Sequence, residues 1–140
     1  MPVCIDASVA LAWLLPHQRS ADVRRAWLQL LASGERLLAP PLFLAECTSV
    51  IREACFDGIL TPAGATEAVA ALVELPVTLV MDRSIYGRAL ELATRFQLRR
   101  AYDTQYLAAA EIERFELLTV DRSMYEHALE LGIRTELLSP

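Results

Sequence analysis

Short runs of apolar, β-prone residues alternate along the chain with longer stretches in which apolar residues recur at helical spacing. This alternation is typical of βαβ units, in which helices cover both faces of a parallel sheet. We therefore predict an α/β fold with a central parallel sheet of about five strands, flanked by helices on both faces. The predicted strands are Val3–Ile5, Leu37–Ala39, Val77–Val80, Leu117–Val120 and Ile133–Leu137. The predicted helices are Ser8–Leu15, Ser20–Ala32, Leu42–Phe56, Pro62–Glu74, Ser84–Phe96, Thr104–Arg114 and Ser123–Leu131.

No linker, Gly/Ser-rich stretch or block of like charges interrupts the 140 residues, which predicts a single domain over residues 1–140. The hydrophobic fraction of 54% excludes a disordered chain. No apolar run approaches the roughly 18–20 residues that span a bilayer, and the composition of the first residues leads us to expect no signal peptide. The three cysteines, Cys4, Cys47 and Cys55, have no C-x-x-C spacing, which argues against a disulfide framework and a zinc site. We expect a cytoplasmic protein.

The charge balance is acidic, with 18 acidic and 13 basic side chains and a net charge of −5. Such a chain is a poor general binder of nucleic acid, because phosphate neutralisation supplies most non-specific affinity. A role on nucleic acid would therefore need a local arginine patch, a bound metal ion or a second chain. Arg99 and Arg100 form one of two adjacent arginine pairs. They are candidates for phosphate contact, and a plain surface loop explains them equally well.

Two carboxylates directly follow predicted strands. Asp6 follows the first strand and Asp121 the fourth, and ligands in open α/β sheets bind at the carboxyl ends of strands. A helix N-cap explains Asp121 as well. The eleven residues from Asp121 repeat those from Asp82 with eight identities. Both copies fit a strand-to-helix junction, so local sequence does not distinguish Asp82 from Asp121.

Two further carboxylates stand out because of the helices that they occupy. Glu46 lies three residues after Phe43 and four before Val50, on the apolar stripe of its predicted helix. A carboxylate there needs a partner or a cavity. The alternatives to a functional role are a salt bridge to arginine and a partly exposed edge of the stripe. Asp103 opens its predicted helix, where an N-cap is the default role.

Acids at two strand ends and in two helices, in a chain with only two histidines, favour a metal site built from oxygen ligands. Mg²⁺ and Mn²⁺ prefer such ligands, and carboxylate-bound ions hydrolyse phosphodiesters without histidine. Without metal, the clustered acids would repel one another, so we expect a loose or partly protonated site. The chain contains no Lys, no P-loop and no G-x-G-x-x-G, which argues against receiver domains, dehalogenase-type phosphatases and nucleotide-binding sites.

Four segments resemble the PIN-domain family, specifically the VapC-type ribonuclease toxins of type II toxin–antitoxin systems. They are Val3–Leu11, Ala39–Glu46, Ala101–Glu111 and Leu117–Arg122, and the resemblance covers essentially the whole chain. It implies a PIN-like domain with an acidic pocket at the strand ends. It also implies a toxin that is a Mg²⁺-dependent endoribonuclease, with Mn²⁺ as the alternative ion. The alternative functions are a catalytically weak PIN-fold module that binds RNA or protein, and an RNA-processing nuclease that is not a toxin.

The resemblance assigns roles to individual residues. The family's four acids match Asp6, Glu46, Asp103 and Asp121. Asp6 and Asp103 are implied as direct metal ligands, Glu46 as a ligand directly or through water, and Asp121 as an outer group. Asp82 would follow an edge strand, away from the pocket.

The resemblance also implies supporting residues and partners. Ser8 and Thr119 match hydroxyl positions that support the pocket, and Ser49 stands where many relatives have Asn. The implied partners are an RNA substrate, a cognate antitoxin and a second copy of the chain in a homodimer, with no membrane involved. A group of apolar residues near the N-terminal helices either lines a groove for a partner helix or belongs to the core. These residues are Trp13, Leu14, Trp27, Leu30 and Leu31.

Overall fold

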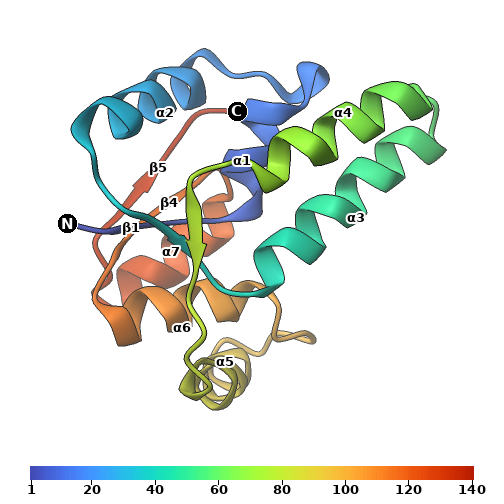
Figure 1. Ribbon diagram of the computed structural model, residues 1–140. Coiled ribbons are helices and arrows are strands. Elements are labelled where there is room, and N and C mark those ends of the chain that lie inside the picture. The colour runs from blue at the N-terminus through green and yellow to red at the C-terminus, as the bar shows by residue number, and fades with distance from the viewer.

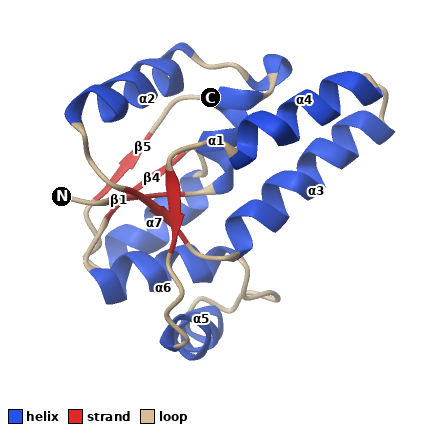
Figure 2. Ribbon diagram, viewed as in Figure 1, coloured by secondary structure: helices blue, strands red, loops and turns tan.

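A five-stranded sheet forms the centre of the computed structural model, which describes residues 1–140 (Figures 1 and 2). The strand order is β3-β2-β1-β4-β5, and every neighbouring pair is parallel. The predicted parallel sheet is therefore confirmed. Its strands are β1 (Val3–Ile5), β2 (Leu37–Ala39), β3 (Val77–Leu79), β4 (Glu116–Thr119) and β5 (Thr135–Leu137).

Helices lie on both sides of the sheet, and Figure 1 shows α2 above it and α6 and α7 below it. The connections between successive strands are helical because parallel strands need long crossovers. The α-helices are α1 (Ala7–Leu14), α2 (Ala21–Ser33), α3 (Leu42–Phe56), α4 (Pro62–Val73), α5 (Ser84–Arg95), α6 (Asp103–Glu113) and α7 (Arg122–Glu130). A short 3₁₀ helix, η1 (Pro16–Gln18), follows α1. None of the helices combines the length and the apolar character needed to cross a bilayer.

The core is centred on β1, β2 and α6. Every residue of β1 and β2 is buried, as expected for inner strands of a sheet covered on both faces. In α6, the five consecutive residues from Tyr106 to Ala110 are buried, so this helix is enclosed on all sides through its middle turns. Small alanine side chains at three of these positions allow close packing of α6. The start of α6 is thereby held in a fixed position relative to the sheet.

The apolar residues near the N-terminal helices divide between core and surface. Trp27 is fully buried, so it belongs to the core and not to a groove. Trp13 stacks on Trp27 with 5.7 Å between ring centroids and, like Leu14 and Leu30, remains partly exposed. Leu31 is exposed.

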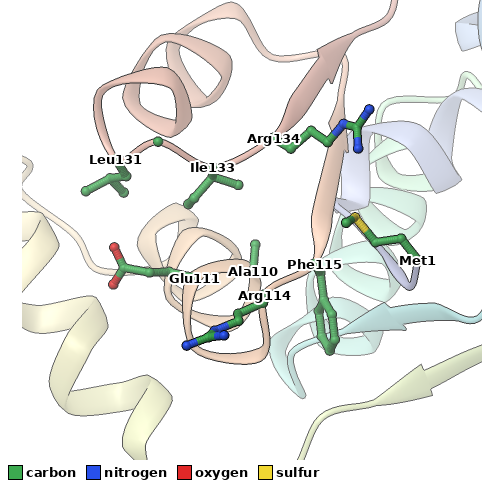
Figure 3. A pocket seen from close by; sticks show the side chains of 9 residues that line it. Met1, Ala110, Glu111, Arg114, Phe115, Leu131, Ile133 and Arg134 are labelled. Atoms are coloured by element: carbon green, nitrogen blue, oxygen red, sulfur yellow. The ribbon is translucent and has the colours of Figure 1, made fainter.

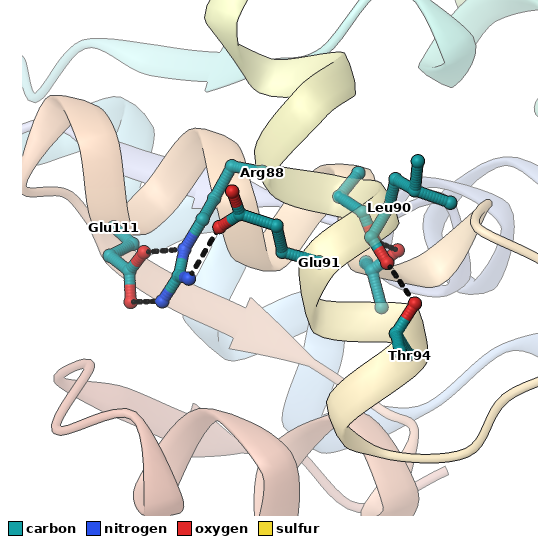
Figure 4. A network of polar contacts seen from close by, with 7 residues as sticks. Arg88, Leu90, Glu91, Thr94 and Glu111 are labelled. Atoms are coloured by element: carbon teal, nitrogen blue, oxygen red, sulfur yellow. Dashed lines mark hydrogen bonds and ion pairs between the residues drawn. The ribbon is translucent and has the colours of Figure 1, made fainter.

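An ion-pair network joins α5 to α6 (Figure 4). Arg88 of α5 donates from Nε to Glu111 Oε1 at 2.6 Å and from Nη2 to Glu111 Oε2 at 3.1 Å. Arg88 also donates from Nη1 to Glu91 at 3.0 Å. A bidentate pair fixes both the distance and the orientation of its partners. The network therefore sets how α5 and the segment that follows it lie against α6.

Six element starts differ from the sequence-based expectation by one or two residues, and two of these differences involve the core and a candidate site residue. Strand β5 begins at Thr135 instead of Ile133, because Ile133 lies in the turn after α7 and packs into the core. Helix α6 begins at Asp103 itself. Its N-cap residue is Tyr102, which makes no side-chain capping bond. The N-cap interpretation of Asp103 is therefore wrong.

The burial of α6 predicts a large difference between two otherwise identical substitutions. Leu107→Ala removes a fully buried side chain and should lower the free energy of unfolding by about 2–5 kcal/mol. Leu90→Ala, in α5, removes a side chain that is 64% exposed and should change it by less than about 0.5 kcal/mol. Urea denaturation followed by circular dichroism measures both values. Equal losses in the two variants would contradict the described position of α6.

Candidate active site

Asp6 is the only residue between β1 and α1, at the carboxyl edge of the sheet. It is the N-cap of α1, and its Oδ1 accepts a hydrogen bond from the Val9 N–H at 3.2 Å. The residue is only 3% exposed. A strand-end acid is therefore built into the first turn of a helix, where the helix dipole favours negative charge.

Two hydroxyl groups hold the Asp6 carboxylate from opposite sides. The Ser8 hydroxyl donates to Oδ1, and the Thr119 hydroxyl, at the end of β4, donates to Oδ2. Each hydroxyl oxygen also accepts a backbone N–H: Ser8 from Val120 at 3.1 Å and Thr119 from Asp121 at 2.9 Å. Because these N–H groups occupy the hydroxyl oxygens as acceptors, both hydroxyl protons are directed at Asp6.

Burial and hydrogen bonding act on Asp6 in opposite directions. The pKa of Asp6 is raised from 3.8 to about 6, chiefly by burial, and the bonds from Ser8, Thr119 and Val9 offset part of this rise. The negative charge of Asp121 raises the pKa of Asp6 further. The carboxyl group is therefore held in one orientation in a place where its negative charge is unfavourable without a compensating cation.

Glu46 lies on α3 and is paired with a tyrosine of α6. The Tyr106 hydroxyl donates to Glu46 Oε1 at 2.9 Å. Burial raises the pKa of Glu46, the bond from Tyr106 lowers it, and the charge of Asp103 raises it. Glu46 takes part in no salt bridge, so an arginine partner does not explain its place on the apolar stripe.

Asp103 and Asp121 stand at the first turns of α6 and α7. Asp121 is the N-cap of α7 and accepts from the Met124 N–H at 3.1 Å. Asp103 is exposed as a whole residue, yet partial burial of its carboxyl group raises its pKa. The charge of Asp121 raises that pKa further, and the opposite charge of His127 lowers it.

The four carboxylates thus form one electrostatically connected group. Charge coupling runs from Glu46 to Asp103, from Asp103 to Asp121 and from Asp121 to Asp6. No three His, Cys, Asp or Glu side chains stand close enough to ligate one ion by themselves. Mg²⁺ retains several waters and is commonly held by one or two carboxylates. The oxygen donors present therefore fit a hydrated divalent cation that relieves the mutual repulsion.

The other residues singled out in the sequence lie outside this group of carboxylates. Ser49 is exposed on α3, three residues after Glu46. Arg99 and Arg100 are exposed between α5 and α6. Asp82 follows β3, an edge strand, and accepts hydrogen bonds from the Ser84 N–H and hydroxyl. The internal repeat therefore contains one carboxylate that belongs to the group, Asp121, and one, Asp82, that bonds to Ser84 at the start of α5 beside the edge strand.

Two residues near the carboxylates were not identified from the sequence. Tyr106 fits the apolar face of α6, and the only signal for its role is that a buried tyrosine hydroxyl needs a partner. His127 lies on α7, and its charge acts on Asp103. No local pattern indicates His127, because α6 and α7 are brought together only by the fold.

A cavity of about 310 Å³ lies at the opposite edge of the sheet, where the strands begin (Figure 3). Its lining includes Met1, Phe115 and Arg134, which precede β1, β4 and β5. None of the four connected carboxylates lines it. The cavity is thus separate from the candidate active site.

The raised pKa of Asp6 predicts a pH-dependent stability in metal-free protein. Folding favours the protonated carboxyl group, because the folded pKa of about 6 exceeds the ordinary value of 3.8. This stabilisation is complete below pH 3.8 and is lost as pH rises through about 6, by about 3 kcal/mol in total. Urea unfolding in EDTA across this range, with Asp6→Asn as the reference, measures the loss. A constant difference between the two proteins would contradict the described burial of Asp6.

Solved structures with the same fold include several proteins from bacteria and archaea. VapBC2 from Rickettsia felis, bound to a DNA fragment from its promoter, matches with a TM-score of 0.73 and 12% identity over 99% of this chain and 100% of that one. PAE2754 from Pyrobaculum aerophilum matches with a TM-score of 0.69 and 17% identity over 94% and 92% of the two chains. FitAcB from Neisseria gonorrhoeae matches with a TM-score of 0.65 and 16% identity over 95% of each chain. At sequence identities this low, the structural similarity establishes a shared fold and nothing more.

No curated protein matches the sequence. The family model of the PIN domain matches residues 3–129. This span includes all four connected carboxylates and the two residues, Ser8 and Thr119, whose hydroxyl groups bond to Asp6. The chain therefore belongs to the PIN domain family.

Proposed function

We propose that this protein is a metal-dependent endoribonuclease that hydrolyses RNA phosphodiester bonds as the toxin of a toxin–antitoxin pair. The observation that carries the proposal is the connected group formed by Asp6, Glu46, Asp103 and Asp121 at the carboxyl edge of the sheet. PIN domains are generally nucleases and usually use divalent metals. The four acids of this chain supply the donor set that such chemistry requires.

Asp6 and Asp103 are the proposed direct ligands of the divalent cation, with Glu46 acting directly or through water and Asp121 as an outer group. Their hard oxygen donors suit Mg²⁺, with Mn²⁺ as the alternative. When bound, the ion supplies positive charge to the phosphate and lowers the pKa of a coordinated water.

The protein's own contribution is to position these carboxylates. Ser8 and Thr119 fix both oxygens of Asp6, so little reorganisation is needed when a ligand binds. Tyr106 holds Oε1 of Glu46, which leaves Oε2 without a protein donor. The α6 helix, enclosed by the core, sets the distance between Asp103 and the sheet. Ser49 has no such contact with the group, and we propose that it adjoins the substrate from the surface of α3.

We propose a cognate antitoxin as the protein partner. A cavity of about 420 Å³ lies between α1, α2 and α4, with Trp13, Leu14 and Ala71 in its lining. Arg19 and Arg24 flank it, and the Arg24 guanidinium carbon lies 5.9 Å from the Trp13 ring centroid. An antitoxin segment with apolar and acidic side chains would match this lining. VapBC2 of Rickettsia felis, which has the same fold, is a toxin–antitoxin complex bound to promoter DNA.

We also propose a homodimer that works in the cytoplasm. Phe56 and Ile59, at the turn between α3 and α4, are large apolar side chains exposed to solvent. Side chains of this kind mark interaction surfaces when they cluster. The three free cysteines suit a reducing compartment.

Cleavage of a labelled mixed RNA pool tests the proposed activity. With Mg²⁺ or Mn²⁺, the partner-free wild-type protein should cut RNA, and EDTA should stop the reaction. Asp6→Asn and Asp103→Asn should each reduce the rate by at least about 100-fold, because each removes a proposed ligand. Asp82→Asn is the matched control, since Asp82 begins the same repeated motif at the edge of the sheet.

The controls also test the toxin role. Asp82→Asn should cut RNA at the wild-type rate, and its expression should arrest growth as the wild type does. Asp6→Asn should do neither while remaining folded by circular dichroism. Cleavage or growth arrest by Asp6→Asn at the wild-type level would refute the proposal.

A further inference from the structure

A layered stack of side chains joins the end of α5 to α7 beside the carboxylate group. Phe96, the C-cap residue of α5, stacks on His127 of α7 with 4.1 Å between ring centroids and 18° between ring planes. The guanidinium carbon of Arg95 lies 5.5 Å from the centroid of the same phenyl ring. Phe96 and His127 are only partly buried, so the stack reaches the surface.

The stack lies close to the proposed cleavage site. Helix α7, which carries His127 and is capped by Asp121, packs against α6, whose first residue is Asp103. The charge of His127 also acts on the Asp103 carboxylate, whose pKa it lowers. The chain between the stack and Asp103 is short, and it ends in Tyr102, whose side chain is 52% exposed. An aromatic residue thus stands at each end of this segment, Phe96 before it and Tyr102 after it.

Unpaired positive charge accompanies the aromatic rings. Arg95, Arg99 and Arg100 are exposed, and none of them takes part in an ion pair. This is a local excess of positive charge in a chain whose net charge is −5. Most of the protein surface should therefore repel a polyanion, while the segment from Arg95 to Arg100 attracts it.

We propose that the stack formed by Arg95, Phe96 and His127 is a binding site for an unpaired base of single-stranded RNA, with Arg99 and Arg100 binding the neighbouring phosphates. Proteins bind unpaired bases by stacking them on aromatic rings and guanidinium planes, while basic side chains follow the backbone. This inference rests on the proposed ribonuclease function and adds that the substrate is unpaired where it is cut. A base on the stack would place the adjoining backbone beside Asp103.

A purely structural role for the stack makes a different prediction. Phe96 packs against the core, so the stack could serve only to fasten α5 to α7. Replacing His127 would then lower stability without changing how the folded protein binds RNA. Comparing an aromatic with an aliphatic replacement separates the two roles, because both fill space and only one offers a ring face.

The test is the affinity of the full chain for a short fluorescein-labelled single-stranded RNA, measured by fluorescence anisotropy in EDTA so that no cleavage occurs. His127→Leu should raise the Kd by about 5- to 100-fold, the range for loss of one stacked base. His127→Phe, which retains a ring, should stay near the wild-type Kd. The double variant Arg99→Gln/Arg100→Gln should weaken binding and flatten its salt dependence. Arg134→Gln, an exposed arginine that precedes β5 at the opposite edge of the sheet, is the control and should bind as the wild type.

The outcomes separate this inference from the proposed function. Equal Kd values for wild type, His127→Leu and His127→Phe would overturn the base-stacking site, as would a wild type that binds no RNA. In either case, metal-dependent RNA cleavage by the wild type would leave the ribonuclease proposal standing. Equal affinity for a duplex of the same sequence would also overturn the site, because paired bases cannot reach the stack. Urea unfolding of each variant confirms that the measured protein is folded.

Discussion

The buried carboxylate of Asp6 is the constraint on which the arrangement of the carboxyl edge depends. Burial of a charge is unfavourable, and the protein offsets it with hydrogen bonds from Ser8, Thr119 and the Val9 N–H. These groups come from α1 and from the end of β4, and both hydroxyl oxygens also hold backbone N–H groups after β4. One side chain therefore fastens the β1–α1 junction to the β4–α7 junction.

The remaining carboxylates are positioned relative to this junction by the helices that carry them. Tyr106 reaches Glu46 because α6 is enclosed in the core opposite α3, and the same helix brings Asp103 near Asp121. The Arg88–Glu111 pair holds α5 against α6. It therefore also limits where the segment between these helices, with Phe96, Arg99 and Arg100, can lie relative to α6. The arginines proposed to bind phosphate thus lie in the segment that leads directly into α6, whose first residue, Asp103, is a proposed cation ligand.

Much of this architecture is predictable from local sequence, because strand and helix signals and strand-end acids are local features. Asp6 and Asp121 were identified from their places after apolar runs. The structure confirms the expected N-cap role of Asp121 and adds that Asp6 is also an N-cap. The Glu46–Tyr106 bond joins residues sixty positions apart, and the Phe96–His127 stack joins different helices, so neither leaves a local pattern. Asp103 was expected to cap α6, whereas Tyr102 occupies that position and Asp103 is the first residue of the helix. Local sequence also fails to distinguish the two copies of the repeat at Asp82 and Asp121. They differ in strand order, because Asp82 follows the edge strand β3 and Asp121 follows the inner strand β4.

Direct measurement of Mn²⁺ binding by electron paramagnetic resonance tests whether these four carboxylates hold a divalent cation, and it needs no substrate. Wild-type protein and Asp82→Asn should bind Mn²⁺ with equal affinity, and Mg²⁺ should displace the ion from both. Asp6→Asn should bind it at least about 10-fold more weakly, because the buried anchor of the group has lost its charge. Equal Mn²⁺ affinity in Asp6→Asn and wild type, or no binding by the folded wild type, would contradict a cation site at these carboxylates.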